Sequence, residues 1–201
     1  MFAGLSAFPL TPITDNGIDL YADAAEFASA PIVVYDNPDT THIDFSDELH
    51  GRIAHRDGIV SIKIPPVSLN ADQATARVER LRALIPAGVT LGVSGDEAGA
   101  TGLLAGCETW YSAIAGALPE PCLAITRAVA GRDGEHALAL SDRMQPVWML
   151  LRQYGSYRVA SAIAEYLGLV TGPSLPRPVQ GLDQAGRRAV AMALAEVGVT
   201  A

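Results

Sequence analysis

The sequence predicts an α/β fold in which a parallel sheet is followed by a tail of helices. Two observations lead to this prediction. Up to about residue 131, short apolar and β-branched runs alternate with helical patterns, which is typical of repeated strand–helix units. From residue 132 onward the strand-like runs stop and only helical patterns remain. We therefore expect a strand–helix core over residues 1–131 and a helical extension over residues 132–201.

Five runs are expected to form the strands, at residues 5–10, 32–35, 59–64, 89–94 and 109–114. The second run has no internal polar residue, as expected for a strand that is covered on both faces. Pro38 follows this run closely and Pro65 directly follows the third run, so both runs end at turns. Gly95 begins the turn after the fourth run. The strands are therefore short and separated by clear breaks.

The helices between the strands carry start signals and one-sided apolar stripes. Ser46 is the expected N-cap of a helix over residues 47–55, and Asn70 is the expected N-cap of the next helix. The apolar residues of that next helix follow the i, i+4, i+7, i+11 spacing of one buried face: Ala74, Val78, Leu81 and Ile85. Further helices are expected at residues 19–28, 97–105 and 119–130. Three more, at 133–154, 156–167 and 183–197, would form the extension.

The charge balance excludes some classes of partner. The chain has 201 residues and a net charge of −8, and 49% of its residues are hydrophobic. An acidic surface does not suit nucleic acid, which is bound through clustered lysine and arginine, and it is repelled by anionic membranes. The first 16 residues carry no positive charge, and the uncharged stretches are too short to span a bilayer. We expect a soluble cytoplasmic protein without nucleic-acid or membrane partners.

Cysteine and histidine do not suggest a metal site. Cys107 and Cys122 lie 15 residues apart, which matches no metal-binding spacing, and we expect buried free thiols. His50 and His55 are five residues apart, so they do not share one helix face. All four histidines are expected at the surface or in loops, and no metal or cofactor is expected.

Lys63 is the strongest candidate for chemistry. It is the single lysine among 14 basic residues, and it lies near the end of the third expected strand. Tyr35 ends the second strand, and because parallel strands present their carboxyl ends at one edge, the two residues should be neighbours. Burial beside Ile62 and Ile64 would lower the pKa of the amine and leave it neutral enough to attack a carbonyl, while a phenol can shuttle protons. The alternative is a lysine that reaches solvent from a strand end, beside a core tyrosine.

Three short motifs decide between these interpretations. Tyr35-Asp-Asn-Pro38, Ser61-Ile-Lys63 and Ser94-Gly-Asp96 resemble, in this order, the signatures of the dihydrodipicolinate synthase and N-acetylneuraminate lyase family. In that family a Tyr-x-x-Pro motif precedes the Schiff-base lysine by one strand–helix–strand unit, and the separation here is 28 residues. Residues 4–12 and 167–173 are similar to the first strand and the C-terminal helical segment of the family.

The resemblance implies a (β/α)₈ TIM barrel with three extra helices, usually in a homo-oligomer. It also implies that Lys63 is the Schiff-base nucleophile and Tyr35 the proton relay, with no cofactor. A complete barrel takes about 250 residues, whereas only about 131 residues precede the extension here, which is enough for four or five strand–helix units of roughly 30 residues. We therefore expect an incomplete barrel of about five parallel strands that lacks the second to fourth units, and with them the family's Gly-Thr-Thr-Gly-Glu-type turn. Either a partner chain covers the open edges, or the strands repack, or the protein is poorly stable.

The pocket residues follow from the same resemblance. We expect the substrate to be lined by Thr11, Gly95, Asp96 and Ser112, with Asp96 alternatively capping the helix that follows it. Thr40 stands where many dihydrodipicolinate synthases have an arginine that meets a second carboxylate, which argues against aspartate semialdehyde as the partner substrate. Trp110 and Tyr111 are expected to pack in the core.

The sequence thus predicts a Schiff-base-forming lyase or aldolase that acts on pyruvate or a related small 2-oxo acid by cleaving or forming a carbon–carbon bond. Two alternatives remain open. One is a non-catalytic, truncated or minimised aldolase-family scaffold. The other is a 2-keto-3-deoxy sugar acid dehydratase or aldolase that uses the same lysine.

Overall fold

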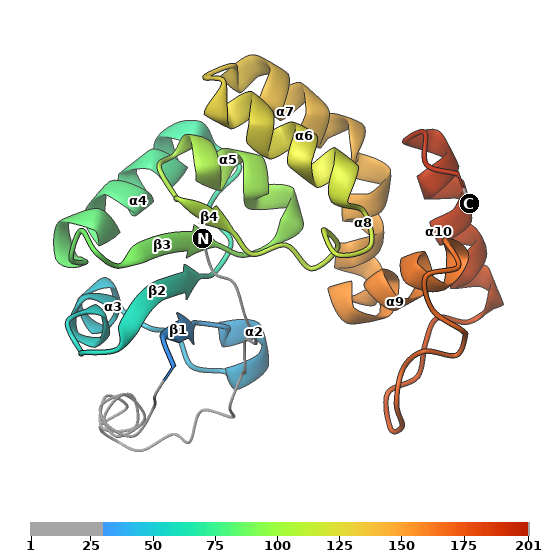
Figure 1. The fold of residues 1–201 in the computed structure, drawn as a ribbon, viewed down its shortest axis with the longest axis horizontal. Helices are drawn as coiled ribbons and strands as arrows, with labels where there is room; N and C mark the ends of the chain where they lie inside the picture. Colours follow the sequence, from blue (N-terminus) through green and yellow to red (C-terminus); the bar gives the residue numbers. More distant parts are fainter. Residues whose placement is uncertain (1–29, 201) are drawn as a thin grey trace.

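The core of the protein is a four-stranded parallel sheet (Figure 1). A computed structural model describes residues 30–200. Its strands are β1 (Ile32–Tyr35), β2 (Ile59–Ile64), β3 (Thr90–Val93) and β4 (Thr109–Trp110), and they lie side by side in chain order. Four of the five predicted strands are therefore confirmed. The predicted strand at residues 5–10 and the predicted helix at 19–28 lie outside the described residues.

The last strand is shorter than predicted, because the chain turns after two residues. Beyond Tyr111, whose N–H still donates to Val93, the amides of the next residues bond to side chains in place of a neighbouring strand. The carboxylate of Asp96 accepts the N–H of Ala113, and the hydroxyl of Ser112 accepts the next two amides. These tertiary contacts end the ladder before residue 114.

The helices beside the sheet begin where their caps predict. They are α2 (Pro38–Thr41), α3 (Asp47–Ala54), α4 (Ala71–Leu84), α5 (Gly99–Leu104) and α6 (Pro119–Ala130). Ser46 accepts the N–H of Leu49 and caps α3, and Asn70 accepts the N–H of Gln73 and caps α4. The helix expected at residues 97–105 is instead a 3₁₀ turn, η1 (Asp96–Ala98), that continues into α5. The short α2 lies where only a turn was predicted.

The extension contains four helices within the described range, one more than predicted. They are α7 (Gly134–Arg143), α8 (Gln145–Tyr154), α9 (Ser156–Tyr166) and α10 (Gln184–Glu196). The single helix predicted over residues 133–154 is wrong, because the chain breaks at Met144. Pro146 has no N–H to donate, and its ring opposes the carbonyl four residues earlier, so it suits only the first turn of a new helix. No helix among residues 30–200 has the length and apolar run needed to cross a bilayer.

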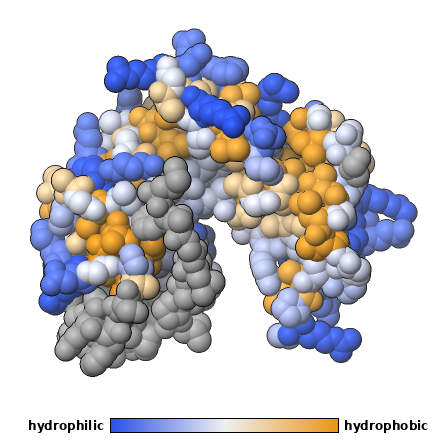
Figure 2. All heavy atoms as spheres, in the orientation of Figure 1, coloured by the Kyte–Doolittle hydropathy of each residue, from blue (hydrophilic) through white to orange (hydrophobic). Residues whose placement is uncertain are grey.

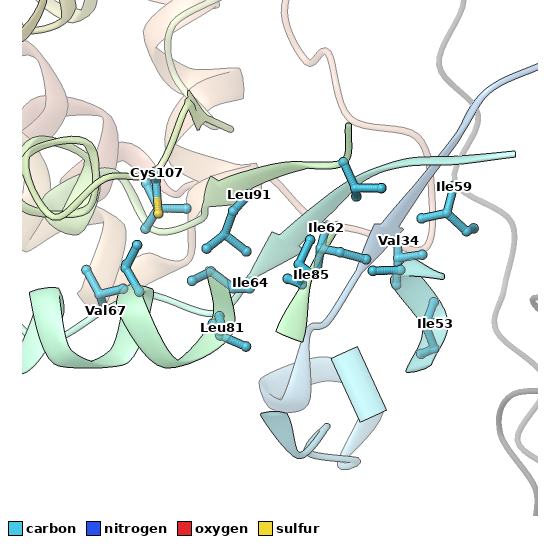
Figure 3. Close-up of a cluster of buried hydrophobic side chains, with 14 of the residues drawn as sticks. Val34, Ile53, Ile59, Ile62, Ile64, Val67, Leu81, Ile85, Leu91 and Cys107 are labelled. Carbon is cyan, nitrogen blue, oxygen red and sulfur yellow. The ribbon is translucent and has the colours of Figure 1, made fainter. Parts of the chain in front are cut away.

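Two apolar clusters hold the fold together. The first fills the space between the sheet and helices α3 and α4, where Val34, Ile62 and Leu91 from the strands meet Ile53 and Leu81 from the helices (Figure 3). The second joins α5 and α6 to the extension around the buried ring of Trp148. Because its members come from both sides of residue 131, the division into 1–131 and 132–201 stays a prediction. Figure 2 shows apolar and polar residues mixed on the surface of the extension.

The strand register gives the sheet two different faces. Val34, Ile62 and Leu91 share one row, and all three are fully buried against the helices. The next row, on the opposite face, contains Tyr35, Lys63 and Gly92. Side chains alternate between the faces of a strand. The apolar face therefore builds the core, and the other face carries the polar residues.

Candidate active site

Lys63 and Tyr35 lie next to each other on the polar face of the sheet. They are register partners on β2 and β1, and the Nζ of Lys63 lies 3.7 Å from the centroid of the Tyr35 ring. This distance suits a cation–π contact between the ammonium and the ring face. The two residues predicted to be neighbours are thus brought together. The ring face of the tyrosine is therefore close to the amine.

Burial tunes the proton affinity of this pair. The half-buried setting of Lys63 lowers the pKa of its amine, and the nearby charge of Asp96 opposes this effect. Burial raises the pKa of the Tyr35 phenol, and the charges of Asp39 and Asp36 raise it further. The lysine is therefore easier to deprotonate than a solvated one, and the tyrosine is kept in its neutral form, as an acid able to donate a proton.

Asp96 supplies a buried carboxylate near the amine. Burial raises its pKa, and contacts with the Ser112 hydroxyl, the Ala113 N–H and the Lys63 charge offset this only in part. Both carboxylate oxygens lie 3.1 Å from the amide nitrogen of Ala113. Gly95 is the N-cap residue of η1, so Asp96 holds the loop after β4 and does not cap its own helix. The capping alternative is therefore wrong, and a place for Asp96 in a substrate pocket stays a prediction.

Gly95 allows the turn that places Asp96. Its φ of 79° lies in the left-handed region, and a Cβ built on it would come within 2.6 Å of Cγ of Pro66. A side chain at this position would therefore clash with Pro66, two residues after the end of β2. The backbone after β3 can pass close to the end of β2 only because this residue is glycine.

The other predicted pocket residues differ in their surroundings. Ser112 lies in the loop after β4, beside Asp96, and its hydroxyl is already occupied by two backbone amides. Thr40 is exposed in α2, where its hydroxyl accepts a hydrogen bond from the side chain of Asn37 at 2.9 Å. Thr11 lies outside the described residues.

Tyr111 is a site residue that the sequence prediction missed. It was expected to pack in the core, but its ring centroid lies 5.6 Å from Nζ of Lys63 and its hydroxyl donates to Ser61 at 2.8 Å. Thr109 pairs with Gly92, and Tyr111 comes two residues later. Given this pairing, the period of two in strands places Tyr111 on the same face as Lys63, but the pairing itself is visible only in the structure.

A second missed feature is a buried histidine–aspartate pair behind the site. Nε2 of His50 lies 3.1 Å from Oδ2 of Asp36, and the two side chains are 0% and 1% exposed. The prediction that the histidines lie at the surface or in loops is wrong for His50, which belongs to the buried face of α3 together with Ile53 and Ala54. The backbone N–H of Asp36 donates to the carbonyl of Lys63 at 3.0 Å. The pair thus anchors the end of β1 beside the lysine.

The two cysteines are buried thiols, and the described residues offer no metal-binding group. Cys107 and Cys122 are free and buried, as predicted, and burial raises the pKa of their thiols to about 12 and about 11. Between residues 30 and 200, no group of three or more histidine, cysteine and acidic side chains is arranged to hold a metal ion.

Comparison with known proteins now assigns the family. The model of the dihydrodipicolinate synthetase family matches residues 9–197. The chain belongs to this family. Among curated members, the 4-hydroxy-tetrahydrodipicolinate synthase of Jannaschia sp. is 27% identical over 92% of the chain, and that of Methylococcus capsulatus is 31% identical over 89%. The chain spans only 62% and 59% of the lengths of these two enzymes.

Solved structures of family members confirm the fold. The dihydrodipicolinate synthase of Agrobacterium tumefaciens superimposes with a TM-score of 0.85 at 37% identity, covering 94% of this chain and 63% of the other. A putative dihydrodipicolinate synthetase from Pseudomonas aeruginosa gives 0.79 at 27% identity, covering 96% of this chain and 64% of the other. A 2-keto-3-deoxygluconate aldolase variant from Sulfolobus solfataricus shares the fold, with a TM-score of 0.73 at 18% identity over 90% of this chain and 59% of the other. The four-stranded sheet and its helices are therefore an incomplete TIM-type barrel, as the motifs predicted.

Proposed function

We propose that the chain acts as a class I lyase or aldolase, in which Lys63 forms a Schiff base with pyruvate or a related 2-oxo acid. The observation that carries this proposal is the setting of the amine. It lies half-buried at the carboxyl end of a parallel strand, its pKa is lowered by burial, and it contacts the ring of Tyr35. The names of the family members, which are synthases of 4-hydroxy-tetrahydrodipicolinate, support a lyase-type reaction.

The first step is the deprotonation of Lys63. Asp96 is the nearby base, because its charge influences the amine and its own burial raises its pKa toward that of a useful proton acceptor. The neutral amine then attacks the C2 carbonyl of the 2-oxo acid. The new C–N bond forms as the carbonyl π bond breaks, and a proton passes from the nitrogen to the oxygen to give a neutral carbinolamine.

The second step is the loss of water. The carbinolamine hydroxyl leaves as water when it receives a proton, and the nitrogen lone pair forms the C=N bond of the protonated imine. Tyr35 is the candidate relay for this proton, because burial and two nearby carboxylates raise the pKa of its phenol and keep it protonated. The imine withdraws electrons from C3, so that loss of a C3 proton gives an enamine. Its C3 then forms the new carbon–carbon bond, and cleavage is the reverse.

Residues at the ends of the strands and in α2 are proposed to contact the substrate. The backbone around Gly95, together with Asp96, Ser112 and Thr11, would line the pocket, and Thr40 would stand near the second substrate. Thr40 has no cation to offer a second carboxylate, which favours a sugar acid or another aldol over aspartate semialdehyde. We also propose that the chain forms a homo-oligomer, because the strands within residues 30–200 form an open sheet and not a closed barrel.

Trapping with borohydride tests the proposal. The protein is incubated with pyruvate and reduced, and the adduct is located by peptide mass spectrometry. We expect a covalent adduct on Lys63, which is the only lysine, so that the N-terminal amine is the single competitor. Lys63→Arg keeps the positive charge but provides no nucleophile, and it should abolish the adduct. A parent protein that shows no adduct on Lys63 would refute the Schiff-base proposal.

Turnover separates the remaining candidates. Because the chain spans about 60% of the curated relatives, a non-catalytic scaffold is the second candidate and would give an adduct without product. A 2-keto-3-deoxy sugar acid dehydratase would use the same lysine but would release water and leave the carbon chain intact. Analysis of the products from 2-keto-3-deoxy sugar acids therefore distinguishes dehydration from carbon–carbon cleavage.

A further inference from the structure

The ring of Tyr111 lies across the sheet and not in the core. A Cβ built on Gly92 would come within 2.3 Å of Cε2 and 2.7 Å of Cδ2 of this ring, so the ring rests directly on the glycine backbone. Tyr111 follows β4, while its hydroxyl reaches Ser61 on β2. The side chain therefore passes over β3 at the one position in the row that has no side chain to obstruct it.

This path places the ring beside Lys63. Ser61 precedes Lys63 by two residues on the same strand and the same face, and Nζ of Lys63 lies 5.6 Å from the Tyr111 centroid. Tyr35 approaches the amine from the β1 side, at 3.7 Å, and Tyr111 approaches from the β3 side. The amine thus has an aromatic ring on each side.

The hydrogen bonds of Tyr111 favour a fixed wall over a proton relay. Its hydroxyl donates to Ser61, and the Ser61 hydroxyl donates in turn to the backbone carbonyl of Thr90 at 3.2 Å. A carbonyl oxygen has no proton to pass on, so the chain of donors ends there. Ser61 is fully buried, which isolates this end from solvent. The bond therefore holds the ring in place.

We propose that Tyr111 is a positioning residue of the Schiff-base site. Its ring, held by the hydrogen bond to Ser61, covers the amine of Lys63 on the β3 side, so that a substrate reaches the amine from the side of Tyr35. This inference rests on the proposed function of Lys63. A wall of this kind excludes water from the amine, and desolvation is the main cause of its lowered pKa. The ring also attracts the ammonium, but at 5.6 Å this attraction is weaker than that of Tyr35 at 3.7 Å.

The test measures the reactivity of Lys63 without any substrate. The rate at which acetic anhydride labels Lys63 is followed against pH by peptide mass spectrometry, which separates Lys63 from the N-terminus. Tyr111→Ala opens the site to water, so we expect the midpoint of the profile to rise by about one pH unit. Gly92→Ala forces the ring to move and should shift the midpoint in the same direction. Tyr157→Ala, at an exposed tyrosine of α9, is the matched control and should leave it unchanged.

Two further variants separate the ring from its hydroxyl. Tyr111→Phe and Ser61→Ala remove the same hydrogen bond from opposite ends, so each should shift the midpoint much less than Tyr111→Ala, and the double variant should shift it no further. An unchanged profile in folded Tyr111→Ala would overturn the inference. So would a Tyr111→Phe shift as large as that of Tyr111→Ala, because the phenol and not the ring would then be decisive. Failure of borohydride trapping would refute the function of Lys63 but would leave these profiles measurable.

Discussion

Replacement of His50 by alanine tests the buried pair behind the site. His50 and Asp36 are 0% and 1% exposed, and their Nε2 and Oδ2 atoms are 3.1 Å apart. No residue between 30 and 200 gives either Asp36 carboxylate oxygen a hydrogen bond of good geometry. The same holds for both ring nitrogens of His50, so the two buried side chains are close neighbours without a well-aligned hydrogen bond between them. Removing one member of such a pair typically costs about 3–5 kcal/mol, because the other charge is left buried.

We therefore expect His50→Ala to lower the free energy of unfolding by about 3 kcal/mol, of which a part is the cavity left by the ring. Urea unfolding followed by tryptophan fluorescence measures this, since Trp148 is buried in the second cluster. His55→Ala, at the C-cap of the same helix, is the control. His55 is exposed and its ring bonds to the carbonyl of Gly51, so loss of the ring should cost about 1 kcal/mol or less.

A second variant isolates the charge. His50→Ala combined with Asp36→Asn should be less destabilised than His50→Ala alone, because a neutral amide costs less to bury than a carboxylate. The reasoning would be refuted if His50→Ala lost no more stability than His55→Ala. It would also be refuted if the Asp36→Asn replacement gave no recovery.

Two other expectations follow from buried titratable groups. Burial raises the pKa of the Cys107 and Cys122 thiols to about 12 and about 11, so both should resist a thiol reagent at pH 8 and react together on unfolding; reaction of either thiol in the native protein would contradict this. Burial also raises the pKa of Asp96, so its contribution to stability is present at low pH and is lost as pH rises through the folded-state pKa. Asp96→Asn should therefore gain stability relative to the parent protein between pH 4 and pH 7, and a constant difference in urea titrations would refute this.

The sequence predicted the Lys63–Tyr35 contact because two simple rules determine it. Parallel strands present their carboxyl ends at one edge, and side chains alternate between faces, so two strand ends one unit apart are neighbours. Capping is similarly local, which is why α3 and α4 begin after Ser46 and Asn70. These features depend on few residues and on short separations along the chain.

The features that were not predicted depend on contacts between distant residues. The end of β4 is determined by Asp96, which binds an amide 17 residues later. The break at Met144 is an exception, because Pro146 was visible and its effect on a helix is known. The burial of His50 requires its pairing with Asp36 across two elements. No local pattern distinguishes such a histidine from an exposed one.

The two faces of the sheet explain how a lysine site can form on an incomplete barrel. Lys63 is held by its strand neighbours Ile62 and Ile64, which are 0% and 1% exposed and pack into the cluster between the sheet and helices α3 and α4 (Figure 3). In the part of the chain that the structure describes, this cluster also includes loop residues such as Val67 and Cys107. The position of the amine therefore depends on the packing of this cluster. In the proposed function, imine formation depends on how Lys63 is held, whereas turnover also depends on the substrate contacts, so borohydride trapping and product analysis test the two steps separately.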